Sequence, residues 1–203
     1  MKYVDKSIKY YVDNLSAKTP TPGGGSVAAL LGAVGCGLLC MVAHFTMDRD
    51  GYNGYKERAR KVIEEVRRIK SQLLSLVDDD IEAYGRLSNA LKRYKYNKLK
   101  VQPSLKKAVL PAAKVCLYTH KAAVGALELA YAGSKSLISD VSVAIYVLDA
   151  AFESALVNVN VNLRDIKDKD YVVKKTQEFS DLHKHMKGIK TEVLSKTKER
   201  MLY

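Results

Sequence analysis

The stretch Thr19-Pro20-Thr21-Pro22-Gly23-Gly24-Gly25-Ser26 ends one helical pattern and opens another. The residues that follow, 27–47, are mostly Ala, Gly, Leu and Val and include no Asp, Glu, Lys or Arg. Ser26 is well suited to cap a helix over this run, which we expect to end near Met47. Glycines at a helix start expose backbone N–H groups at the positive end of the helix dipole. The stretch therefore predicts an anion-binding site, with a plain Pro/Gly turn as the alternative.

Apolar residues recur at helical spacing along the rest of the chain, and no run alternates as a strand would. Further helices are expected over residues 4–17, 55–94, 103–132, 139–163 and 171–201. Turns are expected at 48–54, 97–103, 133–136 and 164–170, where Gly, Pro, Asn, Ser or charged residues gather. The pattern predicts one all-α domain over residues 1–203, an up-and-down bundle of about six helices. The last helix is highly polar and should lie on the outside of the bundle.

The formal net charge is +12, from 34 basic and 22 acidic residues. Such a charge suits a polyanionic small molecule, a nucleic acid or a membrane surface, or it reflects only a solvated basic face. No zinc-finger spacing or ribonucleoprotein motif is present, so no nucleic-acid partner is expected. The apolar run 26–45 is long enough to span a membrane, but its glycines and its amphipathic neighbours favour a buried core helix.

The cysteines and the N-terminal residues indicate a cytoplasmic protein. Cys36, Cys40 and Cys116 make an odd number, which is typical of a reducing compartment, and residues 1–6 form no apolar signal segment. Cys36 and Cys40 are four residues apart, but no further Cys or His follows at zinc spacing. We interpret them as buried thiols and expect no metal site.

Among the consecutive acids Asp78, Asp79 and Asp80, helical phase singles out the last. Asp80 falls on the apolar stripe of the helix expected over 55–94, whereas Asp78 points to the opposite side and Asp79 sideways. A carboxylate on a core face is costly unless it is paired or used, and burial should raise its pKa. Asp80 is therefore a candidate general acid/base, with a structural ion pair as the alternative.

One face of the helix expected over 139–163 carries polar residues at both ends of an Ala-lined strip. Asp140 lies at one end, and Asn158 and Asn162 lie at the other. Asp140 alone is also explained by a favourable interaction with the helix N-terminus. The two amides need hydrogen-bond partners if they are buried, so they are candidates for binding a ligand.

Four blocks together resemble the formiminotetrahydrofolate cyclodeaminase / methenyltetrahydrofolate cyclohydrolase family. The first is Pro20 to Ala29, which contains Gly23-Gly24-Gly25-Ser26. The others are Leu76 to Tyr84, Ser139 to Ala144, and Asn158 to Leu163. They occur in the family's order and extend over nearly the whole chain. The chain departs from the family pattern at Ser134, where an Asn is common, and at His44, where an Asn is frequent.

The resemblance implies an all-α bundle that forms a homodimer, with a folate site between helices and subunits. It implies that Asp80 is the catalytic acid/base and that no cofactor is needed beyond the tetrahydrofolate substrate. The residues expected to bind that substrate are Pro22, Gly23, Gly24, Gly25, Ser26, Tyr84, Ser139, Asp140, Asn158 and Asn162. The basic charge suits a folate with a polyglutamate tail.

The first functional interpretation is cyclisation of 5-formiminotetrahydrofolate to 5,10-methenyltetrahydrofolate with release of ammonia. The alternative within the family is a methenyltetrahydrofolate cyclohydrolase, which adds water to the same carbon and gives 10-formyltetrahydrofolate. An alternative of another class is a non-catalytic basic helical binding protein. The position of Asp80 on a core face argues against this last interpretation.

Overall fold

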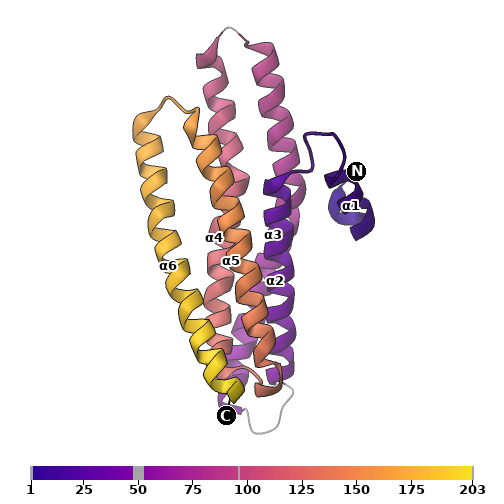
Figure 1. Cartoon of the computed structure of the whole chain (residues 1–203), viewed down its shortest axis with the longest axis vertical. Coiled ribbons are helices and arrows are strands. Elements are labelled where there is room, and N and C mark those ends of the chain that lie inside the picture. Colours follow the sequence, from indigo (N-terminus) through magenta and orange to yellow (C-terminus); the bar gives the residue numbers. More distant parts are fainter. Residues whose placement is uncertain (1, 48–52, 96, 203) are drawn as a thin grey trace.

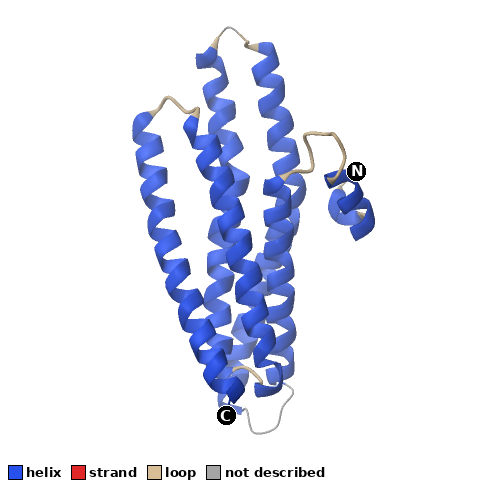
Figure 2. Ribbon diagram, viewed as in Figure 1, coloured by secondary structure: helices blue, strands red, loops and turns tan. Residues whose placement is uncertain are grey.

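The computed structural model describes residues 2–47, 53–95 and 97–202. In this part every regular element is helical, as Figure 2 shows, and the prediction of an all-α bundle of about six helices is confirmed. The elements are η1 (Tyr3–Asp5), α1 (Ile8–Leu15), α2 (Gly24–Met47), α3 (Asn53–Arg93), α4 (Lys98–Ala132), η2 (Lys135–Leu137), α5 (Ile138–Arg164) and α6 (Lys169–Leu202).

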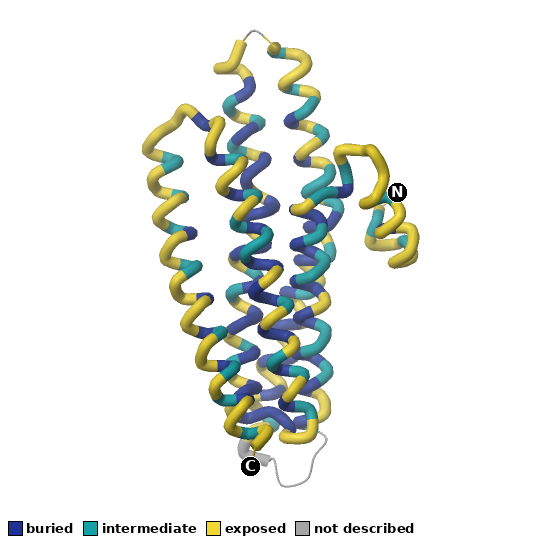
Figure 3. Tube along the Cα trace, viewed as in Figure 1, coloured by how far each residue is buried: buried dark blue, intermediate teal, exposed yellow. Residues whose placement is uncertain are grey.

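Four long helices, α2 to α5, run alternately up and down and form the bundle (Figure 1). α2 packs against α3, α5 and α4, and α6 covers the outside of α4 and α5. The polar α6 is largely exposed in Figure 3, as its composition predicts. The short α1 lies beside the bundle, and the Pro/Gly loop leads from it into α2 (Figure 1).

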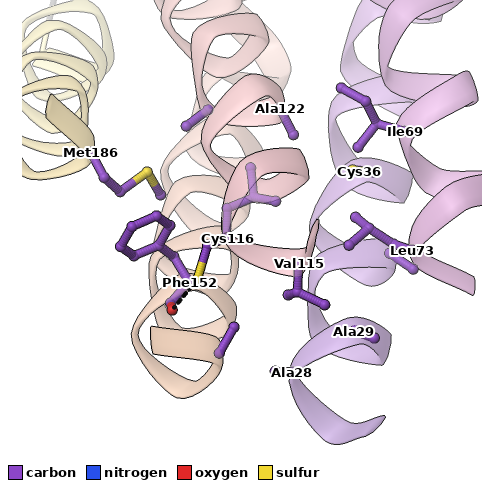
Figure 4. Packing of buried hydrophobic residues seen from close by; sticks show 14 of the residues in the cluster. Ala28, Ala29, Cys36, Ile69, Leu73, Val115, Cys116, Ala122, Phe152 and Met186 are labelled. Carbon is purple, nitrogen blue, oxygen red and sulfur yellow. Dashed lines mark hydrogen bonds between the residues drawn. The ribbon is translucent and has the colours of Figure 1, made fainter. Parts of the chain in front are cut away.

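Small residues let α2 approach its neighbours closely. A Cβ on Gly32 would lie 2.8 Å from Thr119 Cγ2, and one on Gly35 would lie 2.8 Å from Leu148 Cγ. Figure 4 shows Ala28, Ala29 and Cys36 of α2 within the same core as residues of α3, α4 and α5. α2 is the one helix in the described residues with the length and composition to cross a membrane. Its packing against three other helices is that of a core helix.

The cysteine thiols are buried and free. Burial raises the pKa of the Cys36 thiol to about 12, and likewise that of Cys116. Both thiols are therefore protonated at neutral pH and pack as small apolar groups.

Several helix starts differ from the sequence prediction. α2 begins at Gly24, so Ser26 lies inside its first turn and is not the cap. α5 begins at Ile138 after Leu137, which makes no side-chain cap, so Ser139 also lies within the first turn. The sequence signals were correct to within two residues, which is the usual uncertainty of a helix boundary.

The predicted turn over 97–103 is wrong. α4 already begins at Lys98, because the Asn97 side chain accepts a hydrogen bond from the Lys100 backbone N–H and caps the helix. Pro103 therefore lies inside α4, and burial of Val101 and Leu105 on one helical face offsets its missing N–H. The predicted helix over 4–17 divides into η1 and α1, with Ser7 capping α1 by accepting from the Tyr10 N–H. Most of the turn expected at 48–54 lies outside the described residues.

Candidate active site

A cavity of about 230 Å³ lies where the start of α2 meets α3, α4 and the C-terminal half of α5. Each of the four helices and the preceding loop contributes to its wall. The lining residues are Pro20, Thr21, Gly23, Gly24, Gly25, Asp80, Ala83, Tyr84, Leu87, Ala108, Asn158 and Asn162. The cavity thus joins residues from three of the four sequence blocks, which lie far apart along the chain.

Asp80 is the one ionisable carboxylate that lines this cavity. Desolvation by burial raises its pKa above the ordinary value, and the backbone N–H of Ser26 opposes the rise by stabilising the charged form. Within the described residues no side chain donates a hydrogen bond or forms an ion pair with Asp80. A structural ion pair therefore does not account for its position, and the carboxylate remains available to a ligand.

The two neighbouring acids have other environments. The Asp78 carboxylate accepts hydrogen bonds from the backbone N–H groups of Tyr3, at 2.7 Å, and Val4, at 3.4 Å, and so anchors the N-terminal segment. Asp79 is exposed and lines a different cavity, between α3 and α4. Helical phase had separated the three acids, but the anchoring contact of Asp78 joins residues 75 positions apart and has no local sequence signal.

Gly25 lies directly against the Asp80 carboxylate. A Cβ at this position would overlap the carboxyl group, with even the farther oxygen, Oδ2, only 2.8 Å away. The absent side chain thus allows Asp80 to approach the first turn of α2, where backbone N–H groups have no partner within the helix. Gly24 is less confined, since its Cβ would meet the Asn158 amide nitrogen at 3.4 Å.

The two asparagines of α5 lie at the wall of the cavity with part of their hydrogen-bonding capacity unused. Asn158 donates through Nδ2 to the Ser154 carbonyl, and Asn162 donates through Nδ2 to the Ala108 carbonyl. Neither side-chain oxygen accepts a hydrogen bond from a described residue. Two oriented acceptors therefore remain for the N–H groups of a ligand.

Ser26 and Pro22 are adjacent to the cavity without lining it. The Ser26 side chain is fully buried, and its hydroxyl is hydrogen-bonded to the Tyr11 hydroxyl at 2.9 Å. Pro22 is buried in the loop, after a cis Thr21–Pro22 peptide bond. The sequence offered no functional signal for Tyr11, which reads only as part of the apolar face of a short helix.

Ser139 and Asp140 are not brought to this cavity within the chain. They lie in the first turn of α5, and the 19 residues from Ser139 to Asn158 span about 28 Å of helix. Ser134 and His44, the two departures from the family pattern, lie near the same far end. The Ser134 backbone N–H donates to Thr46 Oγ1, and His44 is exposed beside Arg67.

The raised pKa of Asp80 predicts a stability change with a defined pH dependence. Ionisation of Asp80 costs more free energy in the folded chain than in the unfolded chain. The resulting loss of stability begins as pH rises through the unfolded-state pKa of 3.8 and is complete above the folded-state pKa. Asp80→Asn should therefore increase the free energy of unfolding near pH 7, and the gain should vanish at about pH 3. Urea unfolding of both proteins across this range measures it. A gain that is equal at both pH values would contradict a desolvated carboxylate.

Comparison with known proteins places the chain in a family. Residues 7–181 match the family model described as formiminotransferase-cyclodeaminase. The methenyltetrahydrofolate cyclohydrolase of Methylorubrum extorquens is 29% identical over 185 residues, which cover 88% of this chain and 89% of that protein. The formimidoyltransferase-cyclodeaminase of Mus musculus is 30% identical over 97% of this chain. There the match spans only 38% of the relative's length.

A solved structure agrees with the same assignment. The crystal structure of formiminotetrahydrofolate cyclodeaminase from Thermotoga maritima superposes with a TM-score of 0.92 at 29% sequence identity. The superposition covers 98% of each chain. The similar proteins thus bear the names of cyclohydrolase and cyclodeaminase enzymes. The chain belongs to the formiminotransferase-cyclodeaminase family and is an enzyme of that family.

Proposed function

We propose that the enzyme cyclises 5-formiminotetrahydrofolate to 5,10-methenyltetrahydrofolate with release of ammonia. The reaction would take place in the cavity that Asp80 lines, called the Asp80 cavity below. The observation that carries the proposal is a cavity carboxylate with a raised pKa and no side-chain partner among the described residues. A carboxyl group whose pKa is raised by burial is a stronger base than an ordinary aspartate, which suits it to accept and return a proton. The names of the mouse and Thermotoga relatives support the substrate class.

Asp80 would move one proton during this reaction. The para-aminobenzoyl nitrogen attacks the formimino carbon, a new C–N bond forms, and this nitrogen loses its proton to the Asp80 carboxylate. The formimino group reacts in its protonated, amidinium form, so its nitrogen carries three hydrogens once Asp80 has given it the proton. The bond from this nitrogen to carbon then breaks as ammonia leaves, and the positive charge remains on the methenyl bridge. The side-chain oxygens of Asn158 and Asn162 are suited to accept hydrogen bonds from the substrate and to orient it. No further cofactor takes part.

The cyclohydrolase reaction is the second candidate, because the Methylorubrum relative bears that name and is matched over 89% of its length. Here water adds to the methenyl carbon and Asp80 takes a proton from the water. Asp80 then returns this proton to N5, whose bond to carbon breaks, and the remaining hydroxyl loses its proton to solvent as the formyl C=O bond forms on the para-aminobenzoyl nitrogen. The same cavity and the same group would serve both reactions.

Methenyl absorbance separates the two reactions. We expect absorbance and free ammonia to rise together with 5-formiminotetrahydrofolate, at a higher kcat/KM than the loss of absorbance with 5,10-methenyltetrahydrofolate. Turnover of the second substrate alone would establish the cyclohydrolase. If neither substrate turns over and the protein binds nucleic acid with steep salt dependence, a basic binding protein is the correct description.

An adjoining cavity supports a polyglutamylated substrate. It measures about 450 Å³ and shares Leu87 and Asn162 with the Asp80 cavity. Lys95, Lys98 and Lys167 line it together with one carboxylate, Asp165, so cations are in excess there and suit the carboxylates of a γ-glutamyl tail. The KM for a triglutamate substrate should therefore be lower than that for the monoglutamate, and equal values would contradict this part of the proposal.

We propose a homodimer formed by the outward faces of α2 and α5. α2 contains no Asp, Glu, Lys or Arg, yet Val34 is 50% and Phe45 is 57% exposed. On the adjacent α5, Tyr146 is 55% and Val157 is 62% exposed. An apolar face that extends over two helices is typical of a self-complementary interface between two copies.

This dimer would also explain the position of Ser139 and Asp140. In a two-fold pairing with antiparallel α5 helices, the far end of one subunit meets the Asp80 cavity of the other. Ser139 and Asp140 lie near that far end, as do Ser134 and His44, where the chain departs from the family pattern. Each active site would then combine Asp80 from one subunit with Asp140 from its partner.

Complementation between inactive subunits tests the shared site. We expect Asp80→Asn and Asp140→Ala each to be inactive as homodimers, whereas co-expression restores about one quarter of wild-type activity. Half of the dimers are then mixed, and each of these has one intact site of two. Co-expression of Asp80→Asn with Gly25→Ala is the control. Each change disables the Asp80 cavity of the subunit that carries it, so a mixed dimer has no intact site. Failure of the Asp140→Ala mixture to recover would contradict the shared site.

A further inference from the structure

The hydroxyl pair Tyr11–Ser26 connects the N-terminal segment to the Asp80 cavity. The two side-chain oxygens are 2.9 Å apart, and both residues are buried, with Tyr11 only 5% exposed. Ser26 lies in the first turn of α2, next to the glycine against which the Asp80 carboxylate packs. The Ser26 backbone N–H also stabilises the charged form of Asp80. One residue therefore contacts Tyr11 through its side chain and Asp80 through its backbone.

The segment that carries Tyr11 is attached to the bundle at a second point, near its start. Tyr3 and Val4 donate backbone N–H groups to Asp78, two residues before Asp80 on α3. The Tyr3 ring meets the Tyr11 ring edge to face at 5.8 Å between centroids. Asp78 thus fixes the start of the segment against α3, and Tyr11 fixes its helix against the start of α2.

We propose that Tyr11 is a positioning residue that acts on Asp80 through Ser26. By holding the Ser26 hydroxyl, Tyr11 fixes the first turn of α2 in the orientation that points the Ser26 N–H at the carboxylate. The inference rests on the proposed function only for the role of Asp80 in catalysis. The link between Tyr11 and the protonation of Asp80 stands independently of any substrate.

Few charged groups lie near enough to Asp80 to change its protonation independently of Tyr11. Asp78 is close to it on α3, Tyr11 faces it from α1, and Tyr84 lines the same cavity. Tyr3 of η1 lies beside Tyr11. The α4 and α5 residues that line the cavity, Ala108, Asn158 and Asn162, carry no charge. Tyr11→Phe leaves all of these charges unchanged at neutral pH, because the pKa of Tyr11 is raised by its burial.

The experiment is an NMR titration of ¹³C-labelled aspartate carboxyl groups in the substrate-free protein. Asp80→Asn assigns the signal of Asp80. Tyr11→Phe removes a hydrogen bond that favours the charged form indirectly, so the Asp80 midpoint should rise by about half a unit to one unit. Tyr10→Phe is the matched control. It removes a neighbouring hydroxyl of α1 for which no described residue is a hydrogen-bond partner, and it should leave the midpoint unchanged.

The kinetic readout should move with the titration. In Tyr11→Phe the acid limb of kcat/KM should shift to higher pH by the same amount, and Ser26→Ala should add little to Tyr11→Phe, because both changes break one connection. An unchanged Asp80 midpoint in Tyr11→Phe, or an equal shift in Tyr10→Phe, would overturn the inference. If the wild-type protein turns over neither folate substrate, the proposed function fails, while the titration still decides whether Tyr11 controls Asp80.

Discussion

Asp80→Asn should lower kcat for the folate substrate by a factor of about 10²–10⁴, with little change in KM. The amide fills the same space and retains hydrogen-bonding atoms, so the cavity and its affinity for substrate should persist. It cannot accept and return a proton, so the step from nucleophile to leaving group loses its carrier. Steady-state kinetics with a coupled ammonia assay measures the loss.

The control for this prediction is Asp79→Asn, on the same helix and one residue away. Asp79 is exposed and does not line the Asp80 cavity, so kcat should remain near the wild-type value. Circular dichroism of both variants checks that the bundle is intact. Equal losses in the two variants, or full activity in Asp80→Asn, would remove Asp80 from the chemistry.

Gly25→Ala should reduce kcat by about 100-fold, through displacement of Asp80. The new methyl group would overlap the carboxylate, so either Asp80 changes its rotamer or the first turn of α2 moves away from α3. A displacement on the scale of 1 Å is sufficient to lose about two orders of magnitude in a positioned proton transfer. The same kinetic assay measures the effect, and the loss should appear in kcat more than in KM.

Substitutions at two further glycines serve as controls for Gly25→Ala. Gly24→Ala adds the same methyl group where the nearest atom is Asn158 Nδ2 at 3.4 Å, so its loss of activity should be much smaller. Gly188 lies on the exposed helix α6, and a Cβ added there by Gly188→Ala would meet nothing within 4 Å. It should stabilise the protein by about 0.5–1 kcal/mol and leave activity unchanged. If Gly25→Ala is no worse than Gly24→Ala, close contact between Gly25 and Asp80 has no catalytic importance.

The bundle and the position of Asp80 could be predicted because each depends on local periodicity. α3 is 41 residues long and regular, so its helical phase separates Asp80 from Asp79 without knowledge of any other element. The Pro/Gly loop could also be placed, to within two residues of the start of α2. In both cases one stretch of sequence contains the whole signal.

Features that depend on contacts between distant residues could not be predicted in this way. The turn expected at 97–103 failed because the Asn97 cap and the buried face of α4 outweigh the breaking effect of Pro103. The pairing of Tyr11 with Ser26, and of Tyr3 with Asp78, has no pattern in the sequence. Ser139 and Asp140 are predicted to line a folate pocket between helices and subunits, and similarity of sequence blocks does not tell whether two blocks meet within one chain or across two.

A crystal structure of the protein with 5-formyltetrahydrofolate would show whether Asp80 meets the one-carbon group of a folate, because the formyl group of this stable compound occupies the place of the formimino group. We expect the ligand to enter the cavity between α2, α3 and α5. An Asp80 carboxyl oxygen should lie about 2.6–3.2 Å from the formyl group or from the para-aminobenzoyl nitrogen. A folate bound elsewhere, for example in the cavity between α3 and α4 that Asp79 lines, with no contact to Asp80, would exclude Asp80 as the catalytic acid/base.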